Sequence, residues 1–184
     1  MLLGEFVTIL TIIKTKEISQ MGNRTTKSTA YICRSAVIAA LYVVLTLLSA
    51  ALGISSGVIQ FRLSEALCVL PAFTSAAVPG LTLGCLIANF ITGAPVWDVV
   101  FGSLATLLGA LGARLLRKYR FLVPWPTVIA NAAIIPVVLK YAYSVSDAWL
   151  FLVATVSLGE IVCCVVLGGV LEAALKKYGH VLFE

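Results

Sequence analysis

Few side chains in this sequence could do chemistry, and most of them are carboxyl or amide groups inside long apolar stretches. Glu160 lies about 20 Å along the last apolar stretch, by helix rise, and no neighbour in the sequence neutralises it. Asn131 lies inside the preceding stretch. Because an ionisable group within an apolar span is costly and usually functional, we take Glu160 as the first candidate to contact a bound molecule.

Further polar residues gather where apolar stretches begin or end. Together with Glu160 and Asn131 they form the candidate ligand-binding set: Arg62, Glu65, Asn89, Trp97, Asp98, Asn131, Lys140 and Glu160. Carboxylates could accept hydrogen bonds from ring N–H groups or pair with an amine, and nearby aromatic rings could stack on a planar ligand. The pattern predicts a polar pocket open to one side of the membrane.

Simpler interpretations exist for most of these residues. Arg62 and Glu65, three positions apart, could form a salt bridge that caps a helix. Asp98 could merely favour a helix N-terminus, and Asn131 could hydrogen-bond a neighbouring helix. The aromatic residues could form an interfacial belt. Glu160 is the hardest to explain in this way.

No enzymatic constellation is present in the sequence. The single histidine, His180, stands in the C-terminal tail, and there is neither an H-E-x-x-H motif nor a Walker A motif. The cysteines lack metal-ligand spacing and are interpreted as apolar packing residues: Cys33, Cys68, Cys85, Cys163 and Cys164. We therefore expect no catalysis, no metal and no cofactor.

The composition indicates a membrane protein. Hydrophobic residues make up 61% of the 184 and charged residues 11%, whereas soluble domains have about 45–50% and about 25%. So few charges could not cover so much apolar surface in water. We expect an all-α, multi-pass protein in the cell membrane of a bacterium.

The apolar pattern predicts a compact bundle of about six transmembrane helices. They are expected at 32–52, 64–73, 79–91, 96–113, from just after Pro126 to 140, and from just after Asp147 to 176. The second, broken by Pro71, and the third are short for a span of about 20 residues, which is tolerated where helix ends are buried or line a cavity. The connection 53–63 alternates apolar and polar residues and is expected to be partly extended.

The basic residues predict the orientation. They collect before the first span, at 114–120 and at 176–177, whereas Arg62 is the only one in the opposite loops 53–63, 92–97 and 141–147. Cytoplasmic loops collect Lys and Arg, so both termini are expected inside the cell.

We expect two segments: a cytoplasmic N-terminal segment, 1–29, and a single transmembrane substrate-binding domain, 30–184. Met21 is a candidate for the true start, because Lys16-Glu17 can be encoded as AAG GAG, which resembles a bacterial ribosome-binding site.

Small residues recur at helical spacing on several predicted spans. They form faces at Gly80, Gly84 and Ala88, at Gly102, Ala105, Gly109 and Gly112, and at Ala36 and Ala40. Such faces let helices approach closely, either within the bundle or against a partner subunit.

The stretch from Ile59 to Pro71 (IQFRLSEALCVLP) resembles the QueT family of proposed queuosine-precursor transporters. The segments 77–81 (AVPGL), 84–89 (GCLIAN) and 97–107 (WDVVFGSLATL) strengthen the resemblance, which covers roughly residues 30–180. It implies the substrate-binding (S) component of an energy-coupling factor transporter, which binds its ligand from outside and docks on a transmembrane T component driven by two ATPases.

The resemblance also implies a 7-deazaguanine substrate and an A-x-x-x-A docking motif, which Ala36 and Ala40 fit. Glu160 could then accept from ring N1–H and the 2-amino group, Asn131 or Asn89 could read the 6-oxo group, and an aminomethyl cation would favour Asp98 or Glu65. A stand-alone facilitator or secondary transporter is the alternative, although no internal repeat of the kind common in such proteins is visible.

Overall fold

The computed structural model describes the backbone of residues 2–55, 60–144 and 148–183, and the side chains of 27–55, 60–144 and 148–176. All regular structure in these ranges is helical. The elements are α1 (Leu2–Ala51), η1 (Leu63–Ala72), α2 (Ala77–Ile91), α3 (Val96–Leu115), η2 (Arg120–Leu122), α4 (Trp125–Ala142), α5 (Trp149–Glu160), η3 (Ile161–Leu167) and α6 (Gly168–Phe183).

The chain divides into two units, Met1–Arg34 and Ser35–Glu184. The first is helical from Leu2 onward. The second contains the remainder of α1 and every other element, and all packing described below lies within it.

Four helical segments are long and apolar enough to cross a membrane: Lys27–Ala51, Val96–Leu115, Arg120–Ala142 and Trp149–Lys176. Leu63–Ala72 and Ala77–Ile91 are shorter apolar helices. This confirms a helical, multi-pass membrane protein whose second and third apolar segments are short, as the sequence predicted. The expected orientation stays a prediction.

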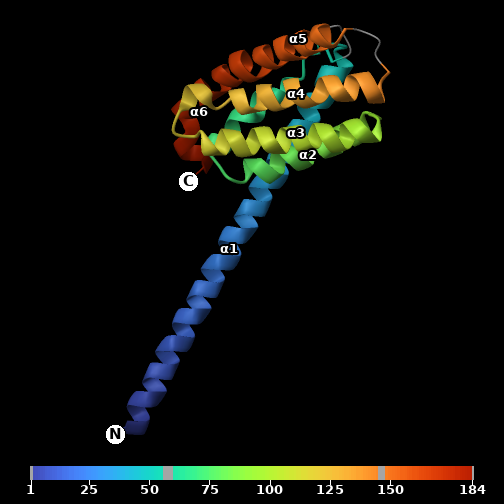
Figure 1. Ribbon diagram of the computed structural model, residues 1–184. Coiled ribbons are helices and arrows are strands. Elements are labelled where there is room, and N and C mark those ends of the chain that lie inside the picture. Colours follow the sequence, from blue (N-terminus) through green and yellow to red (C-terminus); the bar gives the residue numbers. More distant parts are fainter. Residues whose placement is uncertain (1, 56–59, 145–147, 184) are drawn as a thin grey trace. The chain divides into compact units, whose positions relative to one another are not determined.

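Helix α3 lies between α2 and α4, and α5 packs on α4 (Figure 1). The approach of α3 to α4 depends on a small residue, because a Cβ at Gly109 would lie 2.8 Å from the Thr127 Cα. A Cβ at Gly84 would similarly lie 2.9 Å from the Ala39 carbonyl oxygen of α1. These faces therefore pack within the bundle.

The 3₁₀ helix η1 lies in the interior and contacts α2, α3, α6 and η3. Eight of its ten residues are buried, including Glu65 and Pro71. Its preceding residue, Arg62, has an extended backbone (φ −109°, ψ 103°), as expected for this part of the connection. A 3₁₀ helix of this length is uncommon and carries a carboxylate into the core of the bundle.

The last apolar stretch differs from the single helix that we expected. A π-helical segment, η3, separates α5 from α6. Both Cys163 and Cys164 are buried, since η3 contacts η1 as well as α4 and its neighbours α5 and α6. Such segments are rare and frequently lie at functional sites, and this one begins directly after Glu160.

Candidate functional site

Four of the predicted residues line one small polar pocket, here called the inner pocket. Arg62, Glu65, Asn131 and Glu160 come to it from four different elements or connections of the chain. The remaining lining residues are Gln60, Cys85, Gly102, Thr106, Ile135 and Val156. Its volume of about 20 Å³ is room for about one water molecule.

Two carboxyl groups meet at the floor of this pocket. Glu65, Glu160 and Cys164 bring their oxygen and sulfur atoms within 4.8 Å of one another. The Tyr42 hydroxyl donates to Glu65 Oε1, and Cys164 Sγ lies 3.3 Å from Glu160 Oε2 and 3.5 Å from the Glu65 carbonyl oxygen. The three groups could in principle hold a cation, but hydrogen bonds within the protein already engage each of them.

A larger pocket, here called the outer pocket, adjoins the inner one. It has a volume of about 420 Å³, within the range of small-molecule sites. Asn89, Asp98 and Tyr143 line it, and it shares Gln60, Arg62 and Ile135 with the inner pocket. These three side chains therefore stand between the two spaces.

Asp98 joins three parts of the chain at the outer pocket. Its Oδ2 accepts a 2.8 Å hydrogen bond from the Tyr143 hydroxyl and lies 3.7 Å from Arg62 Nη2. Burial, and next the hydrogen bond to Asp98, raise the pKa of Tyr143, so the phenol keeps the proton that it donates. The Asn89 amide donates to the Asp98 carbonyl oxygen at 3.4 Å.

Arg62 thus pairs differently from the helix-capping bridge considered above. Its ion pair within the described ranges is with Asp98, 36 positions away, whereas the Glu65 carboxylate is held by Tyr42. Asp98 does lie in the first turn of α3, but its side chain is 4% exposed and takes part in a network. The general preference of acidic residues for helix N-termini therefore does not by itself explain the position of Asp98.

The model of one protein family, described as the QueT transporter, matches residues 32–177. This protein belongs to the QueT transporter family. A curated relative from Lactococcus lactis subsp. cremoris (strain MG1363), named "Queuosine precursor transporter QueT", is 41% identical over 96 residues. The match covers 51% of this chain and 56% of the relative, so it spans little more than half of that protein. No solved structure matches the chain.

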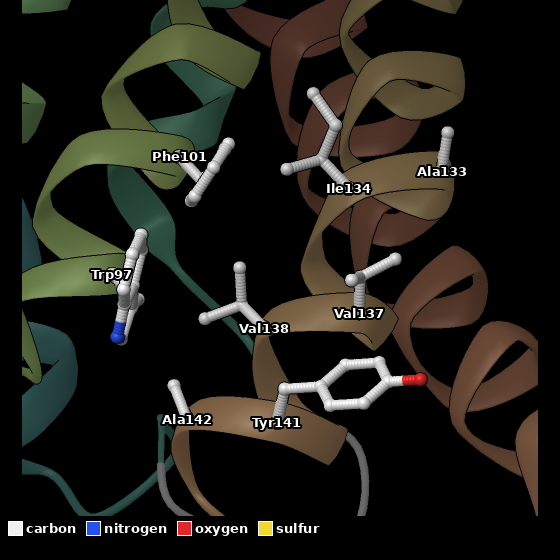
Figure 2. Close-up of a pocket in the computed structure, with 8 residues that line it drawn as sticks. All are labelled: Trp97, Phe101, Ala133, Ile134, Val137, Val138, Tyr141 and Ala142. Atoms are coloured by element: carbon white, nitrogen blue, oxygen red, sulfur yellow. The ribbon is translucent and has the colours of Figure 1, made fainter.

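In this QueT family member, two predicted site residues lie outside both polar pockets. Lys140 is exposed on α4. Trp97 is 63% exposed and stacks on Phe101, with ring centroids 5.9 Å apart. Figure 2 shows both rings on the wall of an apolar pocket, opposite Ile134 and Val138 of α4.

That apolar pocket has a volume of about 440 Å³ and is lined almost entirely by hydrocarbon side chains. It offers a ring such as deazaguanine few hydrogen-bonding partners. The polar candidates of this family member are instead concentrated around Arg62 and Asp98.

The sequence did not reveal several residues at or beside the inner pocket. Gln60, which lines the pocket, and Tyr42, which donates to Glu65, were not singled out, and Cys85 and Gly102 were interpreted only as packing residues. The lone tyrosine of the first predicted span was the available signal for Tyr42. Nothing in the sequence distinguishes Gly102 from the glycines that only permit helix contact.

The predicted docking residues of this QueT family member, Ala36 and Ala40, are both exposed on α1. Ser35 and Ala39, on the other face, are buried against the bundle. Their role in docking a partner subunit stays a prediction. The face of α1 that contains Ala36 and Ala40 is exposed in the single chain.

Proposed function

We propose that this protein is the substrate-binding component of an energy-coupling factor transporter that takes up queuosine precursors, which are 7-deazaguanines. Family membership supports transport, and the name of the curated relative supports the substrate. The observation that carries the proposal on this chain is the buried polar pocket, where Glu65 and Glu160 meet Asn131 inside an apolar bundle. Such groups are costly in a membrane unless a ligand uses them.

The chemistry of the pocket fits the donor-rich edge of a deazaguanine. The Glu160 carboxylate would accept from N1–H and the 2-amino group, and the Asn131 amide would donate to the 6-oxo group. Asn89 and Asp98 would face the remainder of the ligand from the outer pocket. Trp97 and Lys140 lie too far outside these spaces to belong to the proposed set.

Binding would require a local rearrangement. The inner pocket holds about one water molecule, whereas the outer pocket already has the volume of a small-molecule site. Gln60 and Arg62, on a non-helical segment, and Ile135 of α4 separate them, so movement of Gln60 and Arg62 away from Ile135 would merge the spaces. The connection 53–63 would then close over the ligand; residues 56–59 of it lie outside the described residues.

The proposed partners are a transmembrane T component and two ATPase subunits. The exposed Ala36 and Ala40 would let the T component approach α1 closely. The outer pocket would open outside the cell, and the basic residues 114–120 would lie in the cytoplasm. A self-contained facilitator is the alternative function, and it would need no ATPase.

Uptake in cells tests the proposal. A bacterium that cannot make or import queuosine precursors would be given this protein with or without an energy-coupling module, and queuosine in its tRNA would be measured after feeding with precursor. We expect queuosine only when both are present. Restoration without the module would favour the facilitator, and no restoration with a co-purifying module would contradict the proposed substrate.

A further inference from the structure

Carboxyl groups outnumber cationic groups among the side chains that line the two polar pockets. Three carboxyl groups line them, those of Glu65, Asp98 and Glu160, whereas Arg62 is the cationic residue among their described lining residues. Glu65 and Asp98 are 4% and 3% exposed. In so buried a place a carboxylate without a compensating charge is unfavourable, so an added cation would stabilise the group.

One carboxylate oxygen marks where such a cation would bind. Asp98 Oδ2 is engaged by Tyr143 and Arg62, but Asp98 Oδ1 is buried and has no hydrogen-bond partner among the described residues. An unsatisfied buried acceptor costs free energy and calls for an explanation.

The unsatisfied oxygen faces the wall of the inner pocket. A Cβ at Gly102 would lie 3.1 Å from Asp98 Oδ1 and 3.0 Å from Asn89 Nδ2, and Gly102 itself lines the inner pocket. These separations leave no room for a ligand group beside Gly102 itself. Asp98 also lines the outer pocket, whose volume of about 420 Å³ admits a small molecule. An ammonium group with its three donors that reached Oδ1 from the outer pocket would satisfy the acceptor that the described residues leave unpaired.

We propose that, among queuosine precursors, the site selects a deazaguanine whose side arm carries a protonated amine over one whose arm is neutral, with Asp98 Oδ1 accepting from the ammonium group. This inference rests on the proposed function. Arg62 reaches Asp98 only as an ion pair at 3.7 Å, so the ammonium group would add a hydrogen bond that the protein alone does not make.

Matched ligands test the selection. Binding of 7-aminomethyl-7-deazaguanine to the purified full-length protein in detergent would be compared by calorimetry with binding of the 7-hydroxymethyl and 7-cyano analogues. The hydroxymethyl arm has nearly the same size but no charge. We expect the aminomethyl ligand to bind about 10- to 100-fold more tightly, the range of a hydrogen bond to a charged group.

Variants assign the selection to Asp98. Asp98→Asn should reduce the preference to within about threefold, whereas Asp98→Glu should retain most of it, because a hydrogen bond to a charged group is about twice as strong as one between neutral groups. Glu172→Gln is the matched control: it removes another buried carboxylate, which pairs with Lys176 and Arg120 outside both pockets. It should leave the preference unchanged.

The outcomes separate the inference from the proposed function. Equal binding of the charged and neutral ligands, or tighter binding of a neutral one, would overturn the inference and leave the function standing. Failure of the folded wild-type protein to bind any deazaguanine would overturn both. If Asp98→Asn does not fold, the wild-type comparison of the three ligands still decides the selection.

Discussion

At the scale of single residues, the buried polar groups of this protein are held by specific partners. Tyr42 is 2% exposed, and its hydroxyl donates to the Glu65 carboxylate across the interior. The phenol fixes the orientation of that carboxylate toward the inner pocket. The sequence does not predict that Tyr42 and Glu65 pair, because 23 positions separate them.

Tyr42→Phe should therefore destabilise the protein by about 1 kcal/mol, because the ring stays while a buried acceptor loses its donor. Thermal unfolding in detergent would measure it. Tyr141→Phe is the control, since Tyr141 is 79% exposed and its loss should change stability by less than about 0.5 kcal/mol. Equal effects of the two variants would show that the Tyr42 hydroxyl does not stabilise Glu65.

Gly102→Ala should weaken ligand binding about tenfold with little loss of stability. The new methyl group would occupy the space between Asn89 and Asp98 beside the inner pocket, and both contacts are side-chain ends that can shift slightly. Gly169→Ala is the control, because nothing lies within 4 Å of a Cβ there. Unchanged affinity in Gly102→Ala would place the ligand away from this wall.

At the scale of elements, the sequence predicted where helices begin and end better than whether each is an α-, 3₁₀- or π-helix. The third predicted span ends at Ile91 and the fourth begins at Val96, as in the structure. The 3₁₀ geometry of η1 and the π-helical η3 were not predictable, because hydrophobic periodicity reports which residues are apolar and not which carbonyl accepts each hydrogen bond. Glu65 lies in η1 and Glu160 directly precedes η3, and their carboxyl groups lie close together.

Contacts between helices depend on glycine at fixed positions. Gly109→Ala should destabilise the bundle by about 1–3 kcal/mol, because the added Cβ would lie 2.8 Å from the Thr127 Cα, a backbone atom that cannot give way without moving α4. Unfolding in detergent would measure the change against Gly169→Ala. A Gly109→Ala protein as stable as that control would mean that α3 and α4 can separate at no cost.

At the scale of the whole molecule, composition was sufficient for the class of protein but not for the site. The excess of apolar residues predicted a membrane bundle, and the polar residues predicted a pocket. The pairing of Arg62 with Asp98 and the outward position of Trp97 could not be predicted. Both depend on the rotation of each helix about its axis, and spacing along one sequence does not fix that rotation.

The basic residues predict the orientation, and the native cysteines can test it. Cys33 is exposed near the beginning of the first span, whereas Cys68, Cys85, Cys163 and Cys164 are buried. With the N-terminus inside, a membrane-impermeant maleimide should label Cys33 in inverted vesicles and not in intact cells. In a protein that lacks Cys33 (Cys33→Ser), Ser28→Cys, near the beginning of the segment Lys27–Ala51, should behave likewise, and Tyr141→Cys should show the reverse. Labelling of Cys33 in intact cells would contradict the predicted orientation.

Calorimetry on the purified protein shows whether the merged inner and outer pockets bind a queuosine precursor. Wild-type protein would be titrated with 7-aminomethyl-7-deazaguanine, with guanine and riboflavin as control ligands, beside Glu160→Gln. We predict tight and selective binding that Glu160→Gln weakens about 10- to 100-fold, since an oxygen that accepts from the ligand is replaced by an NH₂ group that cannot accept. If folded wild-type protein bound no deazaguanine, or if Glu160→Gln bound it equally well, the proposed site would be wrong.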